Sequence, residues 1–356
     1  MRVAKWTRGL TCAIGLVSRN PHDPHSLIDR QELEQTPAED LDLVFPEDDG
    51  VDMLEEVGLG AIPGVNYTMA QWEAGTFTQN CFEVTQGTDT VERAVGGQCT
   101  LEGLTVYNVT YTDCPQQPWV FCVCDDAEDT IDSVATNFGL VQCPVAARDQ
   151  TAEIVLSGNY TTKDSESSLA GLAYGPTGVV IIFGVYSTVN LFVHEVSHLL
   201  DYWVAGKGEE WYSEGSEWHE VMDNDTCVAD WYALSSYSEA YAQAAVMLAY
   251  DLNVGDVGEV AEDDACMSTA MDLITSQLED FLTYYEDATC TMDQRWEFPV
   301  PWCVKEGQAA PCQAEANSTD SSSNNTTSDN DADADDDDDD SAGASNTIAM
   351  GTLSIA

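Results

Sequence analysis

Basic residues are scarce in this chain, which has 11 lysines and arginines against 64 aspartates and glutamates and a formal net charge of −53. Nucleic acids and anionic membranes attract proteins that present basic patches, so both are excluded as electrostatic partners. Only 10 of the acidic residues are the aspartates between Asp320 and Asp340. The rest of the chain is therefore strongly acidic in its own right.

Long hydrophobic runs are also missing. The apolar stretch nearest the N-terminus, 9–17, is much shorter than the roughly 20 residues that a membrane-spanning helix needs, so we predict no transmembrane segment. Three basic residues precede this stretch at Arg2, Lys5 and Arg8, a pattern typical of a secretory signal. We interpret residues 1–18 as a weak signal sequence; a gene model that starts at the wrong methionine is the alternative.

Cysteines, by contrast, are abundant. Twelve cysteines are more than a reduced cytosolic protein usually carries, and the single residue between Cys122 and Cys124 does not fit a zinc knuckle, so disulfides are predicted. Seven N-glycosylation sequons agree with export; they begin at Asn66, Asn108, Asn159, Asn224, Asn317, Asn324 and Asn325. These features predict a secreted, disulfide-stabilised glycoprotein whose cysteine pairing the sequence leaves open.

The chain divides by composition into three regions after the signal. Residues 19–74 are acidic and contain prolines, which predicts a pro-segment or linker outside the core, and residues 313–356 form an Asn/Ser/Asp-rich tail that we expect to be disordered. The region 75–312 mixes both kinds of periodicity and predicts an α+β catalytic domain. We expect strands at 104–111, 119–123, 153–157 and 178–184, and helices at 130–138, 190–203, 236–251 and 271–285.

The second of these helices carries the motif His194-Glu195-Val196-Ser197-His198. Residues four apart lie on one face of a helix, so both imidazoles can bind a single tetrahedral zinc ion. Glu195 lies about 100° round the helix axis from His194 and can act as general base on a zinc-bound water. The motif predicts a catalytic zinc site; a structural or decayed zinc site is the alternative.

A catalytic zinc ion needs a third protein ligand. Of the remaining histidines, His22 and His25 lie in the acidic segment, and we interpret His219 as an ordinary polar residue. Glu239 is the strongest candidate, because it lies among small and aromatic residues where a carboxylate needs a compensating partner. A glutamate stabilised by the helix dipole in the first turn of its helix is the alternative.

Two further residues have predicted supporting roles. Asp201 lies about 10 Å along the helix from His194, which is too far for the same ion, so we expect it to orient a ligand histidine. Tyr232 is a candidate donor to the negative charge that develops on a substrate carbonyl oxygen. Since Trp231, Tyr237 and Tyr241 lie close by in the chain, an ordinary core tyrosine is the alternative.

These residues resemble two known groups. The pair His194 and His198, with Tyr232 and the segment 239–242, is similar to the gluzincin zinc peptidases, especially the branch related to anthrax lethal factor. A longer region, from about Cys81 to Ala249, resembles the fungal conidiation-specific secreted proteins. The matching segments are 109–114, Cys122, Cys124, 194–201, 216–218, 225–230 and 238–243. The sequence departs from this group at Ala240, where an acidic residue is common.

The resemblance implies an extracellular fungal protein with a zincin-like metallopeptidase domain, an active-site helix and a small twisted sheet. It also implies that the strand at 178–184 is the edge strand that aligns a peptide or protein substrate. We expect Zn²⁺ to be held by His194, His198 and Glu239. The acidic composition favours basic peptides.

Two other functions stay open. The chain could be a catalytically inactive extracellular or cell-wall protein that retains a structural or vestigial zinc motif. Alternatively, the tail could be the functional part, with the aspartates of 331–340 collecting Ca²⁺ or other cations. The small residues of 341–345 and the mildly apolar end of the chain also bear a faint likeness to a GPI-attachment signal.

Overall fold

The computed structural model describes most of the region from residue 36 to residue 312. The described residues are 36–38, 41–47, 50–59, 64–86, 99–140, 144–161, 168–185, 187–261, 264–290, 296, 298–305, 308–312 and 354–355. All of them belong to the unit Gln35–Ala356, whereas the unit Met1–Glu34 lies outside them. The predicted signal at 1–18 and the GPI-like residues 341–345 therefore also lie outside the described residues.

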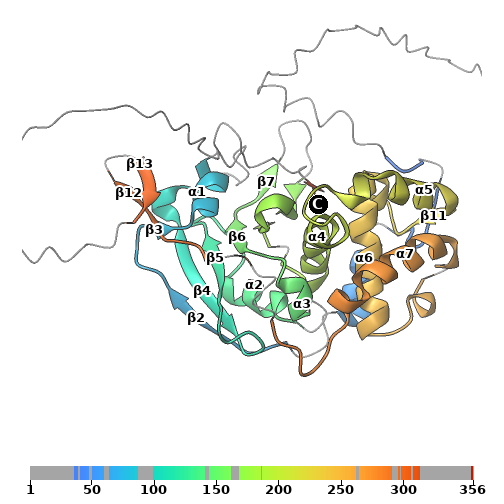
Figure 1. The fold of residues 1–356 in the computed structure, drawn as a ribbon, viewed down its shortest axis with the longest axis horizontal. Coiled ribbons are helices and arrows are strands. Elements are labelled where there is room, and N and C mark those ends of the chain that lie inside the picture. The colour runs from blue at the N-terminus through green and yellow to red at the C-terminus, as the bar shows by residue number, and fades with distance from the viewer. Residues whose placement is uncertain are drawn as a thin grey trace, which may run out of the picture. The chain divides into compact units, whose positions relative to one another are not determined.

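A mixed seven-stranded sheet forms the centre of the fold, in the order β14-β9-β10-β6-β5-β4-β2. Figure 1 labels its strands β2, β4, β5 and β6. Its strands are β2 Tyr67–Gln71, β4 Thr105–Tyr111, β5 Trp119–Val123, β6 Glu153–Ser157, β9 Gly171–Tyr174, β10 Val179–Phe183 and β14 Ser354–Ile355. The central strands β5, β6 and β10 run parallel, and the flanking pairs are antiparallel. The four strands expected within the domain are confirmed as β4, β5, β6 and β10.

The strand β10 is not the edge strand that the resemblance implied, because β9 pairs with its outer side in antiparallel register. The sequence of β10 contains the physical reason, since all five of its residues are buried. Val180 and Ile182 pack into one hydrophobic cluster, and Val179, Ile181 and Phe183 pack into another on the opposite face. A strand with two apolar faces belongs in the interior of a sheet.

Helices flank the sheet, either in direct contact with it or packed on other helices. They are α1 Gln79–Gln86, α2 Ile131–Phe138, α3 Val145–Arg148, α4 Val189–Leu200, α5 Ser216–Asn224, α6 Tyr237–Asn253 and α7 Ser268–Leu282. Three of them begin at a side-chain cap, where Thr130, Thr188 and Ser236 each accept a hydrogen bond from a backbone N–H of the first turn. The four expected helices correspond to α2, α4, α6 and α7.

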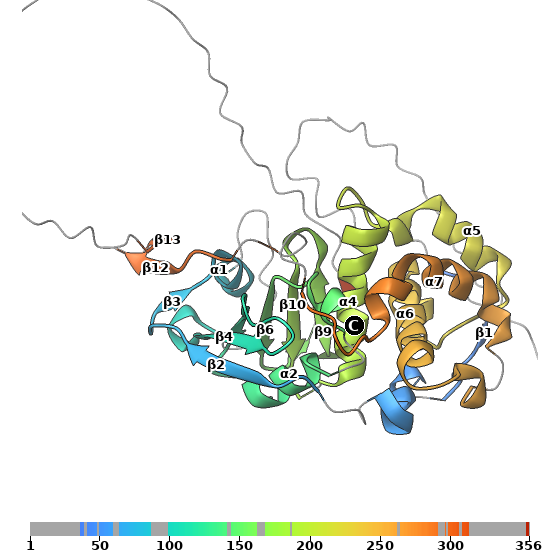
Figure 2. The same cartoon turned by 60° about the horizontal axis from the view of Figure 1, so that its bottom comes forward.

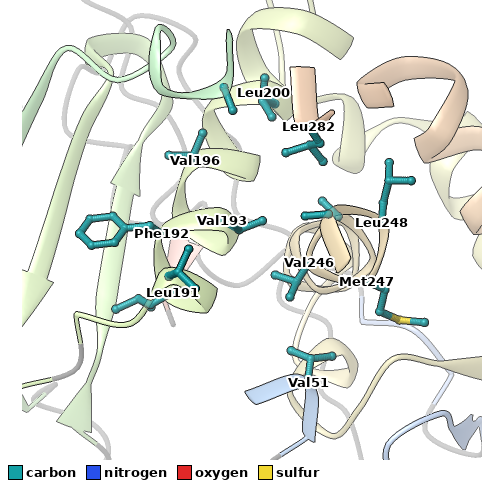
Figure 3. Close-up of a cluster of buried hydrophobic side chains, with 14 of the residues drawn as sticks. Val51, Leu191, Phe192, Val193, Val196, Leu200, Val246, Met247, Leu248 and Leu282 are labelled. Atoms are coloured by element: carbon teal, nitrogen blue, oxygen red, sulfur yellow. The ribbon is translucent and has the colours of Figure 1, made fainter. Parts of the chain in front are cut away.

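The helix α4 lies between the sheet and α6 (Figure 2), and all of its residues are buried. In Figure 3, Phe192 points from α4 toward the sheet and Val193 points toward α6. Phe192 packs against Phe138 of α2, with 5.4 Å between the ring centroids. The motif His194-Glu195-Val196-Ser197-His198 therefore lies on the most completely buried helix in the described part of the chain.

The exclusion of the acidic segment 19–74 from the core is wrong for its described part. The short strand β1, Asp42–Leu43, pairs in parallel with β11, Cys227–Val228, and five later residues are buried in the main hydrophobic cluster: Val44, Phe45, Val51, Leu54 and Leu59. Apolar residues are few here and stand among many acidic ones, yet these five are buried. The composition hid this pattern; the linker and pro-segment roles stay predictions.

Five disulfides confirm the expected use of the cysteines. They join Cys81 to Cys122, Cys99 to Cys124, Cys114 to Cys290, Cys227 to Cys266 and Cys303 to Cys312. Cys12 and Cys143 lie outside the described residues. The Cys114–Cys290 bond spans 176 residues and ties the end of β4 to the chain that follows α7. A cross-link over so long a loop restricts the unfolded chain strongly.

The remaining strands form small sheets, with β3 Thr76–Phe77, β12 Trp302–Lys305 and β13 Gln308–Pro311 in one and β7 Tyr160–Thr161 and β8 Ser168–Leu169 in another. The predicted tail contributes β14 to the main sheet, although disorder was expected there; the rest of the tail lies outside the described residues. No helix in the described part is long and apolar enough to cross a membrane.

We predict that Phe45→Ala lowers the free energy of unfolding by about 3–5 kcal/mol, because it removes a large side chain from the core. Phe45 is 2% exposed, whereas Val57 in the same segment is 44% exposed. The control Val57→Ala should change stability by less than about 0.5 kcal/mol. Denaturant unfolding followed by tryptophan fluorescence measures both. Equal, small effects would mean that the segment is a linker outside the core.

Candidate metal centre

Two helices bring together the three predicted metal ligands. His194 and His198 lie one turn apart on α4, and Glu239 lies in the first turn of α6, which packs against α4. The Nε2 atoms of the two histidines are 3.1 Å apart. One carboxylate oxygen of Glu239, Oε2, is 3.0 Å from the His194 Nε2 and 3.4 Å from the His198 Nε2. The three donor atoms therefore form a nearly equilateral triangle.

This triangle has the dimensions of a zinc site. Zinc–nitrogen and zinc–oxygen bonds of about 2.0–2.1 Å in a tetrahedron put neighbouring ligand atoms about 3.3 Å apart. The observed separations of 3.0 to 3.4 Å bracket that value. All three residues are buried. The other clusters of potential ligands among the described residues each contain two cysteines that are already paired in a disulfide.

The electrostatics of the cluster favour a positive charge between its ligand atoms. Burial alone would lower the pKa of His194, but the hydrogen bond and the charge of Glu239 outweigh burial and raise it to about 9. Burial alone would raise the pKa of Glu239, yet the two histidines lower it to about 2. Without a metal, the buried carboxylate is thus compensated by a proton on His194. A divalent ion can replace that proton.

A chain of hydrogen bonds fixes the orientation of His194. Its Nδ1 is 2.9 Å from Oε1 of Gln243, and Nε2 of Gln243 donates to Oδ2 of Asp230 at 2.8 Å. The Asp230 carboxylate can only accept, so the amide of Gln243 must turn its oxygen toward His194. His194 therefore carries its proton on Nδ1 and presents a bare Nε2 to the cluster when it is neutral.

His198 is oriented by Ser238, whose Oγ is 3.2 Å from the His198 Nδ1. The residue expected for such a role, Asp201, does not perform it in this structure. Asp201 accepts hydrogen bonds from the backbone N–H of Ser213 at 2.9 Å and from the hydroxyl of Ser213 at 2.5 Å. A short helical turn at Tyr212–Glu214 packs on this end of α4 and supplies both donors, which the spacing along the chain could not predict.

Glu195 lies beside the cluster and is completely buried. Among the described residues, neither of its carboxylate oxygens has a hydrogen-bond partner. Burial raises the pKa of Glu195 to about 8 against the opposing effect of the His194 charge. A side chain on Gly171 of β9 would collide with this carboxylate, so the glycine leaves room for it. A buried carboxyl group without a partner, beside a cluster of candidate metal ligands, is suited to proton transfer.

Tyr232 lies near His194, with 5.8 Å between the ring centroids. Burial, followed by the charges of Glu239 and Glu195, raises its pKa well above the ordinary value. The phenol therefore stays protonated and can donate a hydrogen bond. His219, in contrast, stacks on Tyr237 at a centroid distance of 3.7 Å and makes no contact with the cluster.

The sequence interpretation assigned no role to Gln243, Ser238 or Asp230. One signal could have found Gln243, since it lies four residues after Glu239 and so shares its helix face. The same spacing joins His194 to His198 on the facing helix. Asp230 gave no such signal, because its partners come from three separate segments: Val51, Ala233 and Gln243.

The fold and this cluster define a disulfide-linked α+β protein with a buried His-His-Glu centre. A model of the family described as Conidiation-specific protein Con-13 matches residues 47–344. Conidiation-specific protein 13 of Neurospora crassa is 30% identical over 260 residues, which cover 72% of this chain and 70% of that relative. The chain therefore belongs to the Con-13 family. The resemblance to conidiation-specific proteins is confirmed, and neither name states a chemical activity.

We predict that Gln243→Met lowers the affinity of the purified protein for Zn²⁺ by about 10- to 100-fold, because His194 loses the partner that orients it. Competition with a chromophoric chelator measures the affinity. The matched control is Gln79→Met, since Gln79 is exposed on α1 and bonds only within its own helix to Glu83. Unchanged affinity in the Gln243 variant would contradict the orienting role.

Proposed function

We propose that this protein is an extracellular zinc-dependent metallopeptidase with a zincin-like active site. The observation that carries the proposal is the triangle of donor atoms from His194, His198 and Glu239, with the unpaired carboxylate of Glu195 beside it. A purely structural zinc site is normally closed by four protein ligands. This cluster offers three, which leaves one position for a reacting group.

The arrangement of elements supports the zincin-like interpretation. One helix, α4, carries both histidines and the glutamate base, and a second helix, α6, supplies the third ligand. The strand β9 runs on the other side, where Gly171 lies against Glu195. A peptide that reaches the centre would therefore find the general base and the two histidine ligands on one helix, α4, and the carboxylate ligand on the facing helix, α6.

Each side chain of the site has a separate role in peptide hydrolysis. When bound, zinc would act as a Lewis acid that lowers the pKa of water and polarises a carbonyl oxygen. Glu195 takes the proton of the attacking water and passes it to the nitrogen of the leaving amine. Burial raises the pKa of Glu195 to about 8, and this pKa would fall beside a bound divalent cation, so that the carboxylate would be ionised near neutral pH. The Tyr232 phenol donates to the developing oxyanion.

Export is supported by the covalent chemistry of the chain. Five disulfides are typical of proteins that fold in an oxidising compartment. The sequons at Asn66, Asn108, Asn159 and Asn224 lie within the described region. Attachment to a cell wall or a lipid anchor stays a prediction, as does cation binding by the aspartate-rich tail.

We expect Glu195→Gln to retain Zn²⁺ and to lower the rate of peptide cleavage by about 10²- to 10⁴-fold, since the amide cannot accept the proton. Metal content by mass spectrometry and cleavage of a quenched fluorescent casein measure the two effects. Glu220→Gln, an exposed residue of α5, is the control and should behave like the wild type.

Two outcomes would count against the proposal. Equal cleavage by wild type and Glu195→Gln would exclude the general-base mechanism. A wild type that binds one zinc ion and cleaves none of the peptides in a broad library would favour the alternative function, an inactive extracellular protein with a vestigial centre.

A further inference from the structure

A cavity of about 600 Å³ opens beside the metal centre, with His194, Tyr232 and Gln243 in its wall. Its opposite wall comes from the acidic segment that the sequence placed outside the core. The lining there includes Glu47, Asp52, Glu55 and Glu56, and Asp230 adds a fifth carboxylate. Apart from His194, none of the described residues that line it has a side chain that can carry a positive charge.

Not all of these carboxylates are free to bind a ligand. Asp230 already accepts bonds from Val51, Ala233 and Gln243. Glu55 accepts from the backbone N–H of Asn190 at 3.1 Å, and Asp52 accepts from the side-chain amide of Asn190. These two residues therefore also stabilise the start of α4. Glu47 and Glu56 are exposed, and neither takes part in the capping of α4.

Asn190 supplies an observation that is independent of the acidic cluster. Its side chain is 3% exposed and lines the cavity, and its Oδ1 has no hydrogen-bond partner among the described residues. Because the Nδ2 of Asn190 donates to Asp52, the atom without a partner is the carbonyl oxygen, which can only accept. A buried acceptor without a donor costs free energy, and no donor among the described residues of the cavity wall bonds to this oxygen, so a ligand that supplies an N–H group would be favoured here.

The residues around this oxygen constrain the chemical form of the ligand group that would donate to it. It must reach past the exposed rim, where Trp231 is 63% exposed, to a buried carbonyl oxygen and a half-buried carboxylate, Glu55. A long aliphatic stem that ends in N–H groups and a positive charge meets these requirements. Lysine and arginine side chains have this form, and the indole face of Trp231 attracts the same cations.

We propose that this cavity is a specificity pocket that binds the lysine or arginine side chain of a peptide substrate, with Asn190 Oδ1 and Glu55 at its base and Glu47 and Glu56 at its mouth. The inference rests on the proposed peptidase function. The inference adds a substrate class to that function and assigns a role to the segment 47–56. The pocket lies against His194, so the cationic residue is one close to the scissile bond.

The test uses the full-length zinc-loaded protein and pairs of internally quenched peptides that differ at one position only. Lysine at each position around the cleavage site is compared with norleucine, which keeps the stem and removes the charge. We expect kcat/KM for the best lysine peptide to exceed that of its norleucine partner at least about tenfold, with the ratio falling as salt is added. Equal rates at every position would overturn the proposal.

Charge-neutral variants locate the preference in the cavity. In the double variant Glu47→Gln/Glu56→Gln, the lysine-to-norleucine ratio should fall at least about threefold, while the norleucine rate stays unchanged. Neither glutamate belongs to the metal centre or to the cap of α4. Glu279→Gln, an exposed residue of α7, is the matched control and should keep the wild-type ratio. A fall of both rates together would indicate a structural role and contradict the proposal.

A binding experiment separates failure of this inference from failure of the peptidase proposal. Calorimetry with Glu195→Gln measures the affinity for the same peptides without cleavage. Selective binding of lysine peptides by this variant, together with a zinc-loaded wild type that cleaves none of them, would support the pocket and reject the peptidase function. Cleavage without a preference for lysine peptides would support the peptidase function and reject the pocket. Peptides with acetylated and with free N-termini show whether the pocket binds a lysine side chain or the α-amine of the peptide. A preference for lysine peptides that disappears on acetylation would overturn the side-chain assignment.

Discussion

The meeting of three electron-rich atoms at a buried site is the constraint on which the rest of the structure depends. Two imidazole nitrogens and a carboxylate oxygen lie 3.0 to 3.4 Å from one another on α4 and α6. Burial of such groups is costly unless a cation compensates them. When the cation is a metal ion, its binding stabilises the packing of α4 against α6. That packing in turn holds the ligand atoms in place for the ion.

The surrounding residues hold this arrangement in place from several distant parts of the chain. Gln243 and Asp230 connect His194 to the backbone N–H of Val51, in the acidic segment before the main sheet. The same segment packs Phe45 and Leu54 into the core and presents its carboxylates to the cavity. A region that composition alone would describe as a linker thus contributes to the core, to the orientation of a ligand and to the cavity.

Much of the centre could be predicted from the sequence because its ligands follow local rules. The spacing of His194 and His198 determines that both lie on one helix face, and Glu239 was found because a carboxylate among apolar residues needs a partner. The strands β5 and β6 could be predicted to the residue, since both are short apolar runs with clear boundaries. In these cases the information lies within a few residues of the chain.

Other features depend on contacts that no local pattern reports. Asp201 has the position of an orienting residue along α4, yet its carboxylate is bound by Ser213, which a later turn brings to it. The pairing of the cysteines and the place of β9 outside β10 are likewise decided by tertiary packing. Asp230 was missed for the same reason, because it joins three segments.

X-ray absorption at the zinc K-edge of the purified, zinc-loaded protein tests the central claim most directly. The account predicts one zinc ion per chain with two imidazole nitrogens and a carboxylate oxygen at about 2.0–2.1 Å, and Glu239→Ala should lose one oxygen ligand while both imidazoles remain. A spectrum with sulfur ligands, or one that Glu239→Ala leaves unchanged, would contradict the proposed centre.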